Sequence, residues 1–300
     1  MSLAGLKPVL ELRDRLLSAT RLFFHERKYL EVETPVMVRT PALEQHIDAF
    51  QAGGGYLRTS PELHMKRLLA AGYERIFQIG PCFRAGERGR LHNPEFTMLE
   101  WYCAGADYMD ILIETEALLK YVAQACLGRL SFERNAQTID LGGEWKIFSV
   151  GGLFKKYAGW NPLENFDERR FDDDLVSCIE PHLPEDFPVV LKDYPAQAAA
   201  LARLKAGDKH VAERWELYLG GIEIANAFSE LTDAAEQRKR FEDCARRRAL
   251  CGSEAYELDE DFLSALECGM PQSAGIALGL DRLVMLFAGA SSLDDVLPFR

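Results

Sequence analysis

One polar segment, residues 83–102, carries side chains suited to binding a phosphate and an aromatic base. Arg84 precedes a polar loop, and the chain returns through Phe96 into alternating polar and bulky residues. An arginine at the end of a strand offers a two-pronged fork for a phosphate or a carboxylate. Phe96 offers a flat face for a purine. One arginine and one phenylalanine are usually a surface ion pair and a core aromatic, but the whole segment is too specific for that interpretation.

A second segment, residues 275–283, places two glycines around a short apolar strand that enters a helix at Asp281. Arg282 then falls in the first turn of the helix, where the macrodipole disfavours a cation. We therefore expect Arg282 to contact a ligand. The Gly-x-x-x-Gly spacing by itself indicates only close packing of the strand and the helix.

Neither of the common glycine-rich phosphate loops is present. The sequence contains no G-x-x-x-x-G-K-[ST] and no G-x-G-x-x-G that opens a helix. If the protein uses ATP, side chains must hold its phosphates.

Hydrophobic spacing predicts the elements that must position these residues. We expect helices at residues 8–28, 60–71, 107–127, 233–248 and 257–268 and from residue 281 onwards. We expect strands at residues 30–33, 46–50, 56–58, 76–79, 96–102, 215–219, 221–225 and 275–278. The helix near residue 60 begins either with a capping box of Thr59 and Glu62 or with Ser60 as the cap.

The order of these elements predicts an α+β fold. The strands are joined by long irregular connections without βαβ alternation, which favours an antiparallel sheet flanked by helices. We expect one catalytic domain over residues 1–300, with an irregular insertion of short helices and loops at about 128–195.

Composition favours a cytoplasmic globular protein. The 300 residues are 48% hydrophobic and 27% charged, with a net charge of −12. That charge argues against a dedicated nucleic-acid binder, which usually has a basic face. The seven cysteines form no C-x-x-C pair, which is typical of reduced thiols. We expect no signal peptide and no membrane span.

Three segments, at residues 29–35, 83–102 and 275–283, resemble in order and separation the motifs of class II aminoacyl-tRNA synthetases. The strings RLHNPEFTMLEWY (90–102) and EIANAFSELTD (223–233) resemble lysyl-tRNA synthetase in particular. The leading helix starts within about ten residues of Met1, so we expect no anticodon-reading OB-fold. The resemblance is then to short paralogues, the elongation factor P lysine ligases. These enzymes activate lysine or (R)-β-lysine with ATP and transfer it to a lysine side chain of translation elongation factor P.

The resemblance implies a site for ATP and Mg²⁺. Arg84 is expected to contact the α-phosphate and the amino-acid carboxylate, and Phe96 and Arg282 are expected to sandwich the adenine. The full set implied for ATP is Arg84, Glu87, His92, Phe96, Glu216, Glu223 and Arg282. Of these, the two carboxylates that flank a Gly-Gly turn, Glu216 and Glu223, are implied to hold Mg²⁺.

The resemblance also implies a pocket for the amino acid. Its residues are Glu62, Glu100, Tyr102, Asn226, Glu230 and Ala277. A buried ammonium group needs carboxylates and other acceptors around it, and this set supplies them. Glu100 lies between Leu99 and Trp101, where a solely structural role is less expected than a binding role.

Three positions depart from the family pattern. Gly86 stands where an acidic residue is usual, so either Glu87 replaces it through a shifted loop or one ATP contact is weaker. Ala227 replaces a common glycine, and its methyl group either narrows the pocket or fills a gap. Ala277 replaces the glycine of true lysyl-tRNA synthetases and resembles what favours β-lysine in the short paralogues.

Two other functions remain open from the residues. One is a truncated lysyl-tRNA synthetase or another amino-acid ligase of the same fold. The other is a non-catalytic regulatory paralogue, against which the presence of Arg84, Arg282, Glu216 and Glu223 argues. No tRNA is expected as a partner. The family further implies a homodimer with the first motif at the interface.

Overall fold

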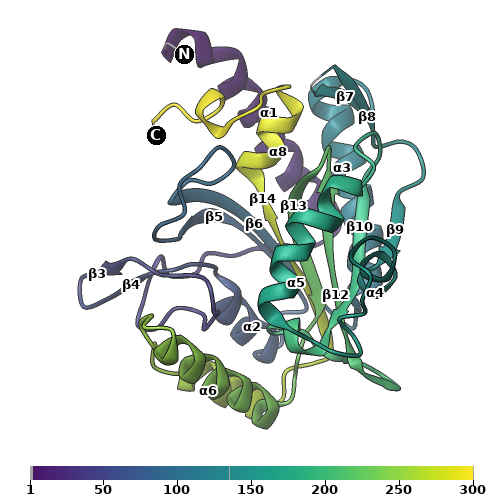
Figure 1. Ribbon diagram of the computed structural model, residues 1–300. Helices are drawn as coiled ribbons and strands as arrows, with labels where there is room; N and C mark the ends of the chain where they lie inside the picture. Colours follow the sequence, from purple (N-terminus) through teal and green to yellow (C-terminus); the bar gives the residue numbers. More distant parts are fainter. Residues whose placement is uncertain (1–2, 135, 300) are drawn as a thin grey trace.

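The computed structural model describes residues 3–134 and 136–299, which fold around one nine-stranded sheet (Figure 1). In spatial order its strands are β1 (Leu30–Glu31), β5 (Arg75–Phe83), β6 (Glu95–Ala104), β14 (Ser273–Gly279), β13 (Ile222–Ser229), β12 (Asp208–Leu219), β10 (Val189–Pro195) and β9 (Lys146–Ser149), with β11 (Leu204–Lys205) beside β12. The pairs β1–β5 and β10–β9 are parallel and the others antiparallel. The predicted α+β fold is confirmed.

Two small sheets and a set of helices surround this centre. The small sheets are β2 (Met37–Val38), β4 (Gly55–Leu57) and β3 (Gln51–Ala52), and β7 (Ser131–Arg134) with β8 (Gln137–Asp140). The α-helices are α1 (Lys7–Glu26), α2 (Glu62–Ala70), α3 (Tyr108–Leu127), α4 (Val150–Leu153), α5 (Glu168–Asp174), α6 (Ala234–Leu250), α7 (Glu260–Glu267) and α8 (Leu280–Phe287). Short helical turns are η1 (Leu3–Leu6), η2 (Phe154–Ala158), η3 (Leu175–Ile179), η4 (Glu180–His182), η5 (Ala196–Ala198) and η6 (Leu293–Asp295). Within the described ranges no helix has the length and apolar character needed to cross a membrane.

The central strands bury one face in the main hydrophobic core. Leu99 and Trp101 of β6, Ile276 of β14 and Leu217 of β12 are at most 2% exposed and pack in one cluster with residues of α1, α3 and α8. Because side chains alternate along a strand, the intervening residues project from the opposite face. That face carries the polar residues singled out in the sequence, and α5 crosses in front of it (Figure 1).

The long helix α3 shows how local sequence fixes an element. Asp107 accepts hydrogen bonds from the backbone amides of Met109 and Asp110, and the Asp110 carboxylate accepts one from the Asp107 amide. This reciprocal capping satisfies amides that the helix itself leaves free. At the other end Gly128 adopts a left-handed conformation with φ 69°, which glycine reaches without strain.

Several predicted elements differ in the structure. The strand expected at residues 46–50 is wrong, because that segment forms only an isolated bridge from Asp48 to Ala85 and the strand begins at Gln51. Residues 128–195 contain strands as well as short helices, and β9 and β10 join the central sheet. Strand β10 is hard to predict because Pro188 precedes it, Pro195 ends it, and a bulge between Lys192 and Tyr194 interrupts its register.

Helix α2 begins at Glu62 with Pro61 at the N-cap position, one residue after the predicted cap Ser60. Ser60 Oγ accepts a hydrogen bond from the Glu62 amide at 3.0 Å. The capping box of Thr59 and Glu62 is wrong, because the Glu62 carboxylate turns along the helix to Lys66 instead. Glu62 is therefore available for a role inside the protein.

A buried arginine of α6 fixes the segment at residues 44–48. Arg248, 1% exposed, donates hydrogen bonds to the carbonyl oxygens of Glu44 at 2.8 Å, Ile47 at 3.0 Å and Glu254 at 2.7 Å. It also pairs with the Asp48 carboxylate at 2.5 Å. Removing a buried donor leaves its acceptors unpaired, and each unpaired group costs free energy.

Replacing Arg248 with Met should lower the free energy of unfolding by about 3 kcal/mol, because several buried carbonyl groups lose their donor. Urea denaturation measures this loss. Arg246 of the same helix is the matched control, since its side chain is 68% exposed and its salt bridge is to the nearby Asp243. Equal losses of unfolding free energy in Arg248→Met and Arg246→Met would contradict the stabilising role of the Arg248 hydrogen bonds.

Candidate active site

A row of side chains crosses the face of the sheet opposite the main core. The strand register aligns Glu100 of β6 with Ala277 of β14, Ala277 with Asn226 of β13, and Asn226 with Glu216 of β12. Residues directly opposite one another share a face of the sheet. Four positions that are far apart in the sequence therefore lie side by side, with Ala277 between two polar side chains.

A cavity of about 340 Å³ lies over one end of this row. Nine of the predicted site residues line it, namely Arg84, Glu87, His92, Phe96, Glu216, Glu223, Asn226, Ala277 and Arg282. The other four lie deeper, around Lys66. The structure thus brings the predicted residues into two adjoining groups, while the role of each residue stays a prediction.

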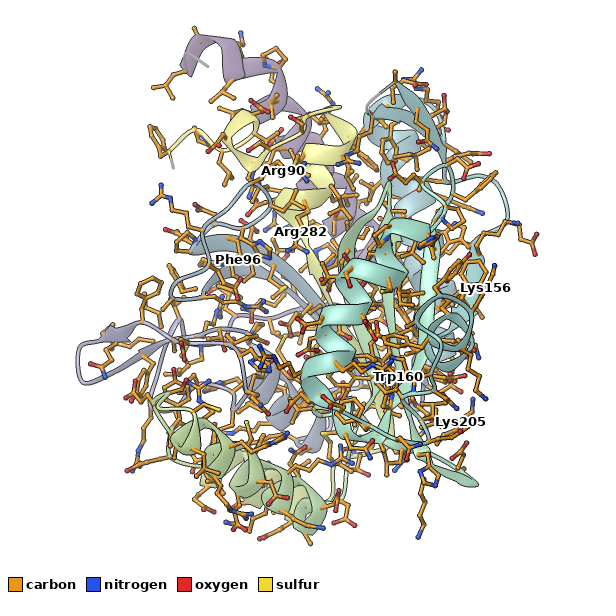
Figure 2. The ribbon with its side chains drawn as sticks, viewed as in Figure 1. Arg90, Phe96, Lys156, Trp160, Lys205 and Arg282 are labelled. Carbon is orange, nitrogen blue, oxygen red and sulfur yellow. The ribbon has the colours of Figure 1, made fainter. Side chains whose placement is uncertain are left out.

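The cavity end near Phe96 is rich in arginine. The Arg84 guanidinium carbon lies 5.1 Å from the centre of the Phe96 ring. Arg282 donates to the Glu223 carbonyl at 2.6 Å and lies 2.9 Å from His92 Nε2. Figure 2 shows Phe96 and Arg282 in the same region, from β6 and the start of α8. Two guanidinium groups and an aromatic ring suit a nucleotide.

Arg282 is placed by the residue before it. The Asp281 carboxylate accepts hydrogen bonds from Arg13 Nη1 at 2.5 Å and from the Thr97 amide at 2.8 Å. These bonds join α8 to α1 and β6. Arg282 Nε also donates to the Leu91 carbonyl at 3.2 Å, so the guanidinium is held where it faces the cavity.

Glu216 and Glu223 lie on adjacent strands around the turn of Gly220 and Gly221. Both glycines have a positive φ, 55° and 70°, which favours glycine at these positions. Desolvation and the neighbouring Glu216 carboxylate raise the pKa of Glu223 to about 7, against the opposing effect of Arg282 and other arginines. A cation beside these two groups would relieve that repulsion.

This donor set fits a magnesium ion that also binds phosphates. Within residues 3–134 and 136–299, no three or more His, Cys, Asp or Glu side chains are grouped so as to hold a metal ion by themselves. Mg²⁺ in nucleotide sites commonly takes one or two carboxylates and completes its ligands with water and phosphate oxygens. Glu216 and Glu223 match that pattern.

The predicted amino-acid pocket contains an internal lysine that the sequence interpretation missed. Lys66 of α2 is 1% exposed, and its Nζ lies 2.5 Å from Glu230 Oε2 and also pairs with Glu62 Oε1. It lies 5.0 Å from the centre of the Phe228 ring. The signal in the sequence is the spacing, because Glu62 and Lys66 are four residues apart on a helix.

Glu230 shares Lys66 with Glu62, and Glu100 forms no salt bridge with any residue that the structure describes. Glu100 accepts hydrogen bonds from Ser60 Oγ at 2.7 Å and Tyr102 Oη at 2.8 Å. Glu230 Oε1 is buried, with no hydrogen-bonding partner among the described residues. Burial and the neighbouring Glu62 carboxylate raise the pKa of Glu100 to about 7. Burial also raises the pKa of Glu230 to about 8, although Lys66 lowers it. Three carboxylates therefore lie around one ammonium group.

Arg214 is a second residue that the sequence interpretation missed. It donates to Asn226 Oδ1 at 3.0 Å and to Glu216 Oε1 at 2.6 Å, and it lies 4.5 Å from the centre of the Tyr194 ring. Arg214 thus holds two predicted site residues in place. Its position two residues before Glu216 on one strand places both on the same face, which is the only signal the sequence offers.

The structure shows the surroundings of the three positions that depart from the family pattern. Gly86 has a φ of 78°, and the following Glu87 lines the cavity with its carboxylate 3.8 Å from Arg84 Nη1. Ala227 is buried in the main core on the opposite face of the sheet, so its methyl group fills a gap and does not narrow the pocket. Ala277 does line the cavity.

Comparison with known proteins then gives the family. The family described as tRNA synthetases class II (D, K and N) matches residues 3–300. A protein of Edwardsiella ictaluri named elongation factor P--(R)-beta-lysine ligase is 41% identical, with 96% of this chain and 93% of that protein covered. Proteins of the same name from Proteus mirabilis and Photorhabdus laumondii are each 40% identical, again over 96% of this chain and 93% of theirs.

This chain belongs to the class II tRNA synthetase family, in the group of these ligases.

In this class II enzyme the polar residues on this face of the sheet form two groups, one toward each end of the strands. Phe96 and Arg282 lie toward the end that suits a nucleotide, and Glu100 lies toward the cluster that suits an ammonium group. Ala277 and Asn226 lie between the two groups. An amino acid bound along this row would direct its carboxylate toward the arginines and its ammonium group toward the carboxylates.

The raised pKa of Glu230 gives a pH dependence of stability. Between pH 4.5 and about 8 the folded enzyme keeps a proton on Glu230 that the unfolded chain releases. The free energy of unfolding therefore falls as pH rises through this range, by up to roughly 1 kcal/mol per pH unit. Glu230→Gln should make the slope shallower, as measured by urea denaturation at several pH values.

The exposed Glu267 provides the control for this measurement, since Glu267→Gln should keep the wild-type slope. An unchanged slope in Glu230→Gln would show that Glu230 is not the group that titrates.

Proposed function

We propose that this class II enzyme activates lysine or (R)-β-lysine with ATP and transfers it to a lysine side chain of elongation factor P. The observation that carries the proposal is the acidic cluster beside the nucleotide cavity. There Glu62 and Glu230 both pair with Lys66, and Glu100 forms no salt bridge within residues 3–134 and 136–299. A second ammonium group, from the substrate, would balance the remaining charge. The names of the relatives support (R)-β-lysine and elongation factor P.

The first half-reaction forms an aminoacyl adenylate. A carboxylate oxygen of the amino acid attacks the α-phosphorus of ATP, and the bond to pyrophosphate breaks. Arg84 neutralises the charge that develops at phosphorus, because it faces the cavity from the strand end. Glu216 and Glu223 would hold a Mg²⁺ ion, which would further neutralise the phosphates when bound. No side-chain nucleophile is required, so positioning and electrostatics supply the rate.

The second half-reaction transfers the acyl group to an amine. The acceptor amine attacks the carbonyl carbon of the adenylate, a C–N bond forms, and the C–O bond to AMP breaks. The net charge of −12 supports a protein acceptor over tRNA, since this chain repels a polyanion on average. The acceptor is then a lysine side chain of elongation factor P.

We further propose a homodimer in the cytoplasm. Exposed apolar side chains on α1, β1 and β2 support an interface there, because Leu22 and Leu30 are each 51% exposed and Met37 is 57% exposed. Scattered exposed apolar residues are common, but several on neighbouring elements favour a contact surface. The seven free cysteines support a reducing compartment.

Replacing Arg84 with Ala should reduce lysine-dependent pyrophosphate exchange by about 100-fold or more, because the transition state loses a preorganised cation. Glu223→Ala should have a similar effect through the metal. Arg88→Ala is the matched control, since Arg88 is an exposed arginine of the same loop that does not line the cavity. Normal exchange in Arg84→Ala would contradict the proposed chemistry.

Replacing Ala277 with Gly should shift the preference from β-lysine toward α-lysine. One methyl group in a pocket is worth ~1–3 kcal/mol of discrimination, so the ratio of kcat/KM values should change by roughly 5- to 150-fold. The two isomers are compared in pyrophosphate exchange. Ala227→Gly serves as the control, because Ala227 lies on the core face of the sheet. An unchanged ratio in Ala277→Gly would exclude Ala277 as the determinant.

A further inference from the structure

A second cavity, of about 830 Å³, adjoins the nucleotide cavity. It lies between α5, η5 and α6, and its lining includes Glu44, Arg214 and Glu216. These three residues also line the first cavity. The two spaces therefore meet at this group of residues, which we call the junction.

The junction lies at the end of the first cavity where the amino acid is expected. Arg214 donates to Asn226, and Asn226 is the strand neighbour of Ala277. Phe96 and Arg282 line the first cavity but not the second. A molecule that enters through the second cavity thus reaches Asn226 and Ala277 without passing Phe96 and Arg282.

The walls of the second cavity are apolar at the floor and charged at the rim. Phe171 and Phe241 are buried and line it from α5 and α6. The charged rim is largely paired within itself, as in the bonds of Arg240 to Glu236 at 2.9 Å and of Arg246 to Asp243 at 2.8 Å. A rim of paired charges does not favour a highly charged ligand such as nucleic acid, whose affinity depends on unpaired basic groups.

We propose that this second cavity is the channel through which the lysine-bearing segment of the acceptor protein reaches the adenylate. The inference rests on the proposed function and names the entry route for its second substrate. The occupant is a lysine side chain on an exposed protein loop, with its aliphatic stem against the apolar floor and its ammonium group at the junction.

Glu44 gives the junction a group that suits an incoming ammonium. Its backbone carbonyl is held by Arg248, and the residue lines both cavities. Burial raises the pKa of Glu44, although Arg84 and Arg214 lower it, so the carboxylate is a stronger base than usual. The acceptor ammonium gives one proton to Glu44. The free amine then forms the C–N bond, AMP leaves with the C–O electron pair, and the second nitrogen proton passes to the AMP phosphate.

Two variants test the channel by separating the half-reactions. Ala196→Trp on η5 places a large side chain in the channel, and Leu175→Glu places a charge on its wall. Each should keep lysine-dependent pyrophosphate exchange within about twofold of wild type, because neither residue lines the nucleotide cavity. Each should lower the rate of transfer to elongation factor P at least tenfold.

Two matched controls carry the same substitutions at exposed positions outside the channel. Val176 follows Leu175 and is 62% exposed outside the channel, and Ala249 is an exposed alanine of α6. Val176→Glu and Ala249→Trp should leave both half-reactions unchanged. Transfer at the wild-type rate by both channel variants would overturn the proposal. A wild-type enzyme without pyrophosphate exchange would contradict the proposed function itself, which is a different result.

Discussion

The burial of three carboxylates beside one lysine is the constraint on which the rest of the site depends. Glu62, Glu100 and Glu230 are each at most 9% exposed, and among the described residues Lys66 is the one base that forms salt bridges with this group. Removing carboxylates from water costs free energy unless a cation or a proton compensates. Burial raises the pKa values of Glu100 and Glu230, which favours their protonated forms. An ammonium substrate can take over that role.

The sheet supplies the geometry that this chemistry needs. Its core face, with Leu99, Trp101 and Leu217, is packed against helices and holds the strands in register. The register then fixes which residues face one another on the other face, and so places Ala277 between Glu100 and Asn226. Specific packing far from the site therefore determines the spacing of the polar row. The second cavity meets this row only because Arg214 and Glu216 belong to the same face.

Much of this arrangement is predictable from the sequence, and the features that are not predictable have physical reasons. Helix α3 follows from its caps, and Arg282 is recognisable because a cation opposes the dipole at a helix start. Lys66 was missed because an isolated lysine in a helix is usually solvated, and only the fold reveals its burial. Ala227 was ambiguous because the face of a strand residue depends on register, which one sequence does not specify.

The transfer reaction itself tests the central claim most directly. Purified enzyme is incubated with ATP, Mg²⁺ and labelled α- or β-lysine, with elongation factor P and bulk tRNA offered in parallel, and the label on each acceptor is measured. Our account predicts label on the lysine side chain of elongation factor P and none on tRNA. Label on tRNA would contradict the assigned acceptor, and label on neither with intact pyrophosphate exchange would show the right activation chemistry with a different acceptor.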